Sequence, residues 1–431
     1  MKKNILFLIT ALIFSGHLFS QSIDKIINAA EVERIERILS ADSLEGRRAF
    51  TPAIDKAADF IASEFKKSGL QYFAGLNSYR QEFGVIRTKP ISVEGNFDGQ
   101  TLESKNIIVI TTTPELIINN NSGYQLVHIR KDSSFRNMSA DYLQSDKNLL
   151  VIVDTSFSRN FANLSRLRQQ FKKNNSIIFV LSGADPVNYN LHFKHEIAEQ
   201  KLANVVGVLP GKSRKGEYVV FAGHYDHLGI GKPDAKGDSI YNGANDDAAG
   251  TTAVIMLAKY FSQLKNNERT LIFVAFTAEE IGGYGSQYFS KQLNPDKVVA
   301  MFNIEMIGTE SKWGTNSAYI TGYERSDFGK ILQANLADSK FHFEADPYPK
   351  QILFFRSDNA TLARLGVPAH TISTSKMEQP PNNEPNYHKQ SDEIGALDMN
   401  NMAEIIKSIA ISSKTIVSGK DTPSRVTNVS R

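Results

Sequence analysis

Cysteine is absent from the 431 residues of this sequence. The absence excludes disulfide bonds, thiolate metal ligands and a lipid anchor on an N-terminal cysteine. With 41% hydrophobic residues, the chain can instead be stabilised by a large buried core. Any metal ion must be held by histidine and carboxylate side chains, a set that suits zinc or a related divalent ion.

The sequence also lacks an excess of charge of one sign. Lys and Arg number 49 against 46 Asp and Glu, which gives a net charge of +3. Proteins that bind nucleic acids usually carry a much larger positive excess. We therefore expect no nucleic-acid partner.

Long apolar runs are scarce, and beyond the first twenty residues none is long enough to cross a bilayer. Residues 1–20 begin with two lysines, continue with an apolar run from Ile5 to Phe14 and end in small and polar residues. This order is typical of a cleaved signal peptide. We expect a periplasmic or extracellular protein without stable membrane insertion after signal removal; an uncleaved anchor is the alternative.

The chain ahead of residue 201 divides into two parts. In residues 21–87, an apolar stripe at helical spacing (Ile54, Ala58, Ile61) predicts N-terminal helices that pack on the main domain. Residues 88–200 alternate short apolar runs with polar patches, which indicates an inserted smaller α/β or β module. The alternative is irregular surface of one large domain.

Residues 201–417 carry the most regular pattern. Apolar runs such as Leu271 to Phe276 alternate with helical stripes. This alternation predicts an α/β fold with a mixed, mostly parallel central sheet and helices on both faces. Residues 418–431 are polar and are predicted to form a flexible tail.

Histidine and carboxylate residues follow several of these predicted strands. Because ligands of open α/β sheets bind at the carboxyl ends of strands, these residues are candidates for one site. His224 and Asp226 follow the predicted strand from Val219 to Ala222 and point the same way in extended backbone. This arrangement predicts that His224 is a metal ligand and Asp226 its orienting partner. His227 is out of phase with both, and we interpret it as a surface residue or a residue behind the ligands.

Two further stretches carry acidic residues. Asp246 leads into a helix among small residues that permit close approach of an ion, although a helix N-cap is a common alternative for Asp. Glu279 and Glu280 follow the strand that ends at Phe276. Adjacent carboxylates at a strand end are costly without a cation, so Glu280 is predicted to bind metal and Glu279 to transfer protons. A solvent-exposed acidic pair is the alternative.

The last two stretches complete the set. Glu305 lies inside an apolar run, where an unpaired carboxylate is unfavourable and a cation partner is expected. His388 is a further candidate ligand, and the adjacent Tyr387 has a hydroxyl suited to stabilising an oxyanion. Three carboxylates, two divalent ions and a bridging hydroxide sum to zero charge. Asp246 is the natural bridge between such ions, and Glu279 fits the base for the attacking hydroxide.

These stretches, in this order, resemble the co-catalytic zinc exopeptidases of the bacterial leucyl aminopeptidase and glutamate carboxypeptidase superfamily. The resemblance covers roughly residues 203–412 and implies two Zn²⁺ per chain, peptide substrates and a zinc exopeptidase fold. It implies metal ligands at His224, Asp246, Glu280, Glu305 and His388, and catalytic residues at Asp226, Glu279 and Tyr387. Leu44 to Arg47 and Asn204 to Gly211 also resemble landmarks of the family, and residues 88–200 lie where many members carry a protease-associated domain.

The function that the resemblance implies is aminopeptidase action on peptide N-termini through a dinuclear zinc-bound hydroxide, with Glu279 as general base. One departure is Glu305, where the best-known aminopeptidases have Asp. Alternatives on the same fold are a carboxypeptidase, a one-zinc glutaminyl cyclase and a non-catalytic receptor-like protein. Arg356 is expected at the pocket rim, either binding a substrate carboxylate or the oxyanion, or paired with Asp358.

Overall fold

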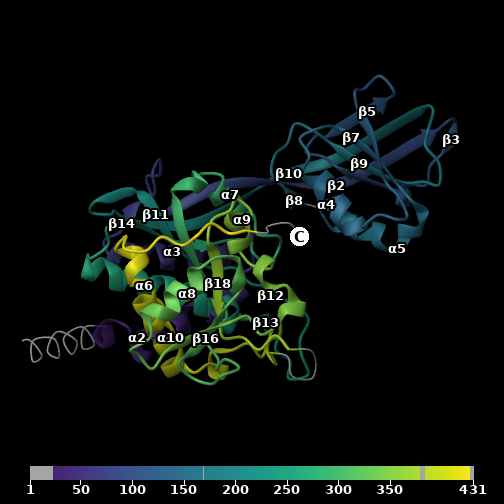
Figure 1. Cartoon of the computed structure of the whole chain (residues 1–431). Coiled ribbons are helices and arrows are strands. Elements are labelled where there is room, and N and C mark those ends of the chain that lie inside the picture. Colours follow the sequence, from purple (N-terminus) through teal and green to yellow (C-terminus); the bar gives the residue numbers. More distant parts are fainter. Residues whose placement is uncertain (1–22, 168, 379–383, 428–431) are drawn as a thin grey trace, which may run out of the picture. The chain divides into compact units, whose positions relative to one another are not determined.

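The computed structural model describes residues 23–167, 169–378 and 384–427, and the predicted signal peptide lies outside them. The described residues form two compact units, one within residues 83–201 and the other from the rest of the described part (Figure 1). The division falls inside strands β2 (Arg80–Phe97) and β10 (Tyr189–Leu209), whereas the sequence predicted boundaries at residues 88 and 200.

A mixed sheet forms the centre of the larger unit, in the order β17-β16-β18-β15-β11-β14-β10. Four neighbouring pairs are parallel and two are antiparallel, β10 with β14 and β16 with β18. The strands besides β10 are β11 (Arg214–His224), β14 (Arg269–Phe276), β15 (Val298–Ile304), β16 (Ser317–Ile320), β17 (His342–Ala345) and β18 (Ala369–Ser373). The predicted fold class is thus confirmed.

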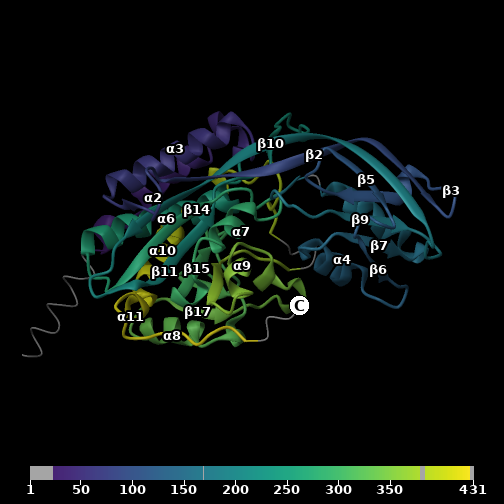
Figure 2. The same ribbon diagram turned by 90° about the horizontal axis from the view of Figure 1, so that it is seen from above.

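Helices cover both faces of this sheet, so β14, β15 and β18 are buried at every position, and β14 and β15 are apolar over most of their length (Figure 2). On one face α6 packs against β11, where Phe221, Phe261 and Phe302 stack. The opposite face is covered by α7 and α9, which contribute Phe289 and Leu362 to a common apolar cluster. The helices are α2 (Ala29–Leu39), α3 (Pro52–Lys67) and α10 (Met399–Ser412) around α6 (Ala249–Leu264), then α8 (Phe328–Asn335), α7 (Tyr284–Ser290) and α9 (Asn359–Ala363).

The register of the parallel strands brings their carboxyl ends to one edge. His224, the last residue of β11, lies opposite Phe276, the last residue of β14. Ala222 lies opposite Asn303 near the end of β15. The loops that follow these three strands therefore begin side by side, and they carry most of the predicted site.

The smaller unit has its own core. A second sheet has the order β4-β9-β7-β6, with β4 (Ile107–Ile110), β9 (Ile177–Leu181), β7 (Leu149–Val153) and β6 (Gln125–Ile129). Alternate residues of β7 and β9 enter two separate apolar clusters, one on each face of the sheet. Packing on both faces explains why β7 and β9 are uninterrupted apolar runs.

The end of the chain differs from the expected flexible tail between residues 418 and 427. Val426 is buried and joins the apolar cluster under α7 and α9. Arg425 donates hydrogen bonds to the carbonyls of Val298 and Leu365. The prediction was wrong here because polar composition does not reveal a single apolar anchor. Residues 428–431 lie outside the described part.

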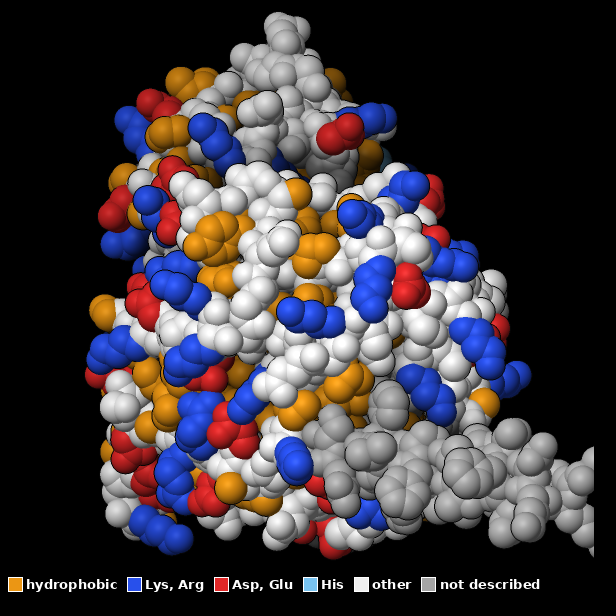
Figure 3. Space-filling view, turned by 90° about the vertical axis from the view of Figure 1, so that its left-hand side faces the viewer, with side chains coloured by type: hydrophobic (Ala, Val, Ile, Leu, Met, Phe, Trp, Pro, Cys, Tyr) orange, Lys and Arg blue, Asp and Glu red, His pale blue; other side chains and the backbone are white. Residues whose placement is uncertain are grey.

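The surface agrees with the charge balance of the sequence. On the face seen in Figure 3, Lys and Arg side chains are interspersed with Asp and Glu, without a field of one sign. In the described ranges, no helix combines the length and apolar character that crossing a bilayer requires.

Candidate active site

Asp246 lies between two imidazoles, one on each of its carboxylate oxygens. Its Oδ1 atom is 3.3 Å from Nε2 of His224, and its Oδ2 atom is 3.2 Å from Nε2 of His388. Nε2 of His388 is also 3.3 Å from Oε2 of Glu280. The Asp246 side chain is 3% exposed. Its two oxygens face two different histidines, so the carboxylate can belong to two groups of ligands.

Two groups of possible metal ligands share Asp246. One consists of His224, Asp246 and Glu305, and the other of His227, Asp246 and Glu280, so His227 stands in the second group where the sequence predicted His388. Oε2 of Glu305 is buried and has no hydrogen-bond partner, and Oε1 of Glu280 is buried with only the His227 ring beside it. Leaving buried carboxylate oxygens unpartnered is unfavourable, and divalent cations bound by these residues would satisfy them. The residues present therefore fit a pair of ions.

The pKa values of the histidines also indicate that this site favours positive charge. Burial lowers the pKa of His388, but hydrogen bonds with Asp246 and Glu280 outweigh it and raise the pKa to about 10. The pKa of His224 is also raised well above its usual range because the surrounding carboxylates outweigh burial. Without metal, protonated His224 and His388 supply the positive charge among these carboxylates. Metal binding would release these protons.

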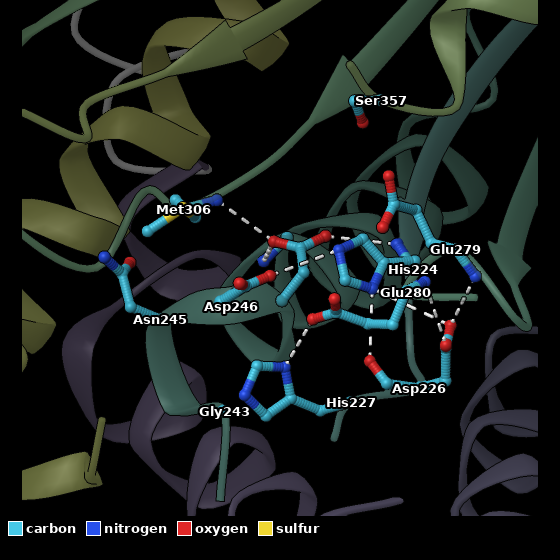
Figure 4. Close-up of polar contacts among 12 residues, drawn as sticks. His224, Asp226, His227, Gly243, Asn245, Asp246, Glu279, Glu280, Met306 and Ser357 are labelled. Carbon is cyan, nitrogen blue, oxygen red and sulfur yellow. Dashed lines mark hydrogen bonds and ion pairs between the residues drawn. The ribbon is translucent and has the colours of Figure 1, made fainter. Parts of the chain in front are cut away.

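The Asp226 carboxylate positions Glu279 and Glu280, whereas the sequence predicted that it orients the His224 ring (Figure 4). Its carboxylate accepts hydrogen bonds from the amides of Glu279 and Glu280, at 3.0 and 3.3 Å. Nδ1 of His224 lies 3.1 Å from the backbone carbonyl of Asp226 and 3.8 Å from its carboxylate. The expected orientation of His224 thus runs through the carbonyl, because the carboxylate is occupied by two amides.

Glu279 differs from Glu280 in its surroundings. Figure 4 shows the two side chains diverging from adjacent positions, with Glu280 directed toward Asp246 and His227. Burial raises the pKa of Glu279 well above its usual range, and the neighbouring carboxylates Glu305 and Asp358 add to the effect. A carboxylate with a raised pKa has the basicity that a general base requires.

Asp247 performs the helix-capping function that the sequence left open for Asp246. Its carboxylate accepts hydrogen bonds from the amides of His224, Gly250 and Met306, at 3.1, 3.0 and 3.0 Å. These amides belong to the end of β11, the start of α6 and the loop after β15. Asp247 therefore ties three site-forming segments together and leaves Asp246 free to face the ligands; the peptide bond between them is cis.

Arg47 and Asp392 also hold the loops, and no role was predicted for either of them. Arg47 is 1% exposed and donates hydrogen bonds to the backbone carbonyls of Leu39, Tyr225, Asn242 and Gly243. The carboxylate of Asp392 accepts from the amides of Asn245 and Asp246. The only sequence signal for Arg47 was the landmark at residues 44–47.

His227 is buried, which excludes a surface position and leaves the alternative of a residue behind the ligands. Its side chain is fully buried, and its Nδ1 atom lies 2.8 Å from Oε1 of Glu280. The strand β11 ends at His224. Beyond that residue the alternation of strand side chains no longer applies, so the phase of residue 227 does not predict its direction.

Tyr387 and Arg356 lie beside the ligands, on the lining of one pocket with Glu305. The Tyr387 ring stacks on His388 with centroids 3.9 Å apart. Arg356 is exposed and donates to Oε1 of Gln351, whereas Asp358 is buried and burial raises its pKa to about 7. Among the described residues the two form no ion pair, so the expected alternative for Arg356 is not realised.

Left-handed backbone occurs beside three site residues. Ala278 before Glu279, Met306 after Glu305, and His388 itself have φ of 59°, 53° and 56°. Non-glycine residues rarely adopt this conformation, which costs about 1–3 kcal/mol and concentrates at functional sites. These turns give the side chains directions that a regular strand does not offer.

Residues 204–411 match Peptidase family M28. A probable zinc metalloprotease of Leptosphaeria maculans is 31% identical over 113 residues, so the match spans 26% of this chain and about a quarter of that relative. The zinc aminopeptidase BSAP from Bacillus subtilis has the same fold, with 16% identity, a TM-score of 0.54 and coverage of 94% of this chain and 99% of that chain. A glutaminyl cyclase from Porphyromonas gingivalis has 11% identity, a TM-score of 0.50 and coverage of 91% and 99%. At these identities the structural likeness shows the fold alone.

Proposed function

We propose that this protein is an aminopeptidase with two zinc ions. Residues 204–411 match Peptidase family M28, in agreement with the resemblance to zinc exopeptidases. The observation that carries the proposal is the position of the Asp246 carboxylate between two groups of buried ligands. His224 and Glu305 would hold one ion with it, and Glu280 and His388 the other.

The chemistry divides between the ions and the chain. Ions held by these residues would polarise a peptide carbonyl and would lower the pKa of a bound water. Glu279 takes the proton of the attacking water and returns it to the leaving amine. The amides of Glu279 and Glu280, held by Asp226, keep these two carboxylates in fixed directions. Tyr387, beside His388, donates its hydroxyl to the oxyanion.

The charge around the pocket favours a free amino terminus over a free carboxylate. Glu305 lines the pocket, and it raises the pKa of both Glu279 and Asp358, so the three carboxyls lie close together. A substrate ammonium group gains from this acidic surrounding, whereas a C-terminal carboxylate is repelled by it. Arg356 on the pocket lining is the opposing feature, since it would attract a carboxylate.

The test compares aminoacyl p-nitroanilides with N-acetylated peptides that carry a free C-terminus. We expect hydrolysis of the former alone, with two zinc ions per chain measured by mass spectrometry. Cleavage of N-blocked peptides alone would contradict the aminopeptidase. Cyclisation of N-terminal glutamine at one zinc per chain would instead support the cyclase alternative.

Export belongs to the same proposal. The charged start and short apolar run of residues 1–20 support a cleaved signal peptide. Expression in a bacterial host should give a mature protein without these residues, released by osmotic shock or secreted. An intact N-terminus in the cytosol would contradict export.

A further inference from the structure

His227 is a buried imidazole that the proposed mechanism does not use. It is 1% exposed, its Nδ1 atom contacts only the Glu280 carboxylate, and its Nε2 atom has no hydrogen-bond partner. The buried His370, by contrast, contacts the hydroxyl of Ser326 and the carbonyl of Thr321 through its two nitrogens. A buried nitrogen without a partner, beside a carboxylate that is itself a predicted metal ligand, is unfavourable, so the position of His227 calls for a ligand.

The surroundings of His227 identify the kind of ligand. Its Nδ1 atom lies 2.8 Å from Oε1 of Glu280. His227, Asp246 and Glu280 each offer a ligand atom, and the three atoms lie within 4.8 Å of one another. Zinc ligands lie about 2.0–2.2 Å from the ion, so two ligand atoms of a tetrahedral site are about 3.4 Å apart. The spacing suits one common ion.

His388 approaches the same carboxylate from its other oxygen. Its Nε2 atom is 3.3 Å from Oε2 of Glu280, and its ring centroid is 5.8 Å from that of His227. The two imidazoles therefore flank Glu280. They differ in burial, because the side chain of His388 is 36% exposed and that of His227 is fully buried. Figure 4 shows the His227 ring directed at Glu280.

We propose that His227 is a further protein ligand of the ion held by Asp246, Glu280 and His388. This inference rests on the proposed two-ion function. The site that contains Glu280 then has four protein ligands and the site that contains His224 has three. As a neutral ligand His227 leaves the charge of the centre unchanged. The ion is anchored from the buried side, so it remains bound when the exposed His388 is removed.

The first measurement is zinc K-edge X-ray absorption on the full wild-type chain loaded with Zn²⁺. Three imidazoles shared by two ions give an average of about 1.5 per zinc, against about 1 without His227. The second measurement titrates Co²⁺ into apoprotein and follows its visible spectrum. The variants are His227→Ala, His388→Ala, the double variant, and His195→Ala as control. His195 is also buried without a hydrogen bond, but it belongs to no metal-binding group of the described residues.

The expected result is that His227→Ala weakens the second ion by more than about 100-fold, beyond the loss of an outer partner of a ligand. His388→Ala should retain the ion more weakly, the double variant should lose it, and His195→Ala should match wild type. An average of one imidazole per zinc, or unchanged Co²⁺ affinity in His227→Ala, would overturn the inference.

Failure of the proposed function would look different. If wild type takes up a single ion, the dinuclear centre is contradicted whatever the variants do. The His227 inference is still decided in that case. It stands if His227→Ala loses the ion and falls if that variant keeps it.

Discussion

The two units contain similar parallel strands but differ in the residues that come directly after those strands. In the smaller unit, β7 is followed by Asp154, whose carboxylate accepts the amide of Ser156 in a surface turn. In the larger unit, Glu279 and Glu280 follow the end of β14 after two intervening residues, and the side chain of Glu280 is 7% exposed. Hydrogen bonds with Ser156 lower the pKa of Asp154, whereas burial raises the pKa of Glu279. A carboxylate at a strand end therefore indicates a site only where burial leaves it without ordinary partners.

Metal removal should produce the largest difference between the units. Chelation is expected to abolish peptidase activity, and Zn²⁺ should restore it. Ions at 100 times their Kd stabilise the state that binds them by about 2.7 kcal/mol. Hydrogen exchange should therefore accelerate in residues 224–227, 244–248 and 279–283 of the apoprotein, and stay constant in residues 149–157. Equal acceleration in both segments would break the comparison.

Removal of the proposed general base, Glu279, should give the next largest effect, on kcat. Glu279→Gln should lower kcat by about 10³-fold, because the proton acceptor is lost while the ligands remain. Zinc content should stay at the wild-type value. Asp154→Asn, which changes the strand-end carboxylate of the smaller unit, should leave kcat within a factor of two, as expected for a surface turn. Retained activity in Glu279→Gln would assign the base elsewhere.

Close packing at the sheet edge gives a third contrast. A Cβ at Gly250 would collide with the carbonyl of Ile304 and the carboxylate of Asp247, whereas a Cβ at Gly216 would contact nothing within 4 Å. Gly250→Ala is expected to lower the free energy of unfolding of the larger unit by about 3 kcal/mol or more. Gly216→Ala should change it by less than about 0.5 kcal/mol. Chemical denaturation measures both, and equal stability of the two variants would refute the close approach.

Glu36 offers the most specific test, through the pH dependence of stability. Burial raises its pKa from 4.5 to about 8, against a lowering contribution from the Thr252 hydroxyl and the nearby Arg47. Between about pH 4.5 and 8 the folded state therefore holds a proton that the unfolded state releases. This contribution to stability is complete below pH 4.5 and is lost as the pH rises toward 8.

Glu36→Gln removes that proton from the balance. Up to about 1.4 kcal/mol per pH unit of the decline should disappear, so the variant gains relative stability at pH 8. Denaturation at several pH values measures the slope. A slope unchanged from wild type would show that Glu36 is not protonated in the folded state.

The residue types that follow the predicted strands were sufficient to identify most of the candidate site residues. Glu305 was informative because an unpaired charge inside an apolar run is unfavourable. The pair Glu279 and Glu280 was informative because adjacent carboxylates at a strand end are costly without a cation. The sequence could not distinguish the roles of Asp246 and Asp247. Adjacent carboxylates have the same chemistry, and which one caps α6 depends on where the amides of His224 and Met306 lie.

By itself, the sequence determined the alternation of strands and helices, the absence of sulfur ligands and the set of histidines and carboxylates available. These follow from side-chain periodicity and composition, which are local properties. Only the tertiary structure decided that His227 is buried, that Arg47 binds carbonyls of three separate segments and that Val426 anchors the last residues. Each of these depends on backbone brought together from distant positions, and no local pattern records that distance.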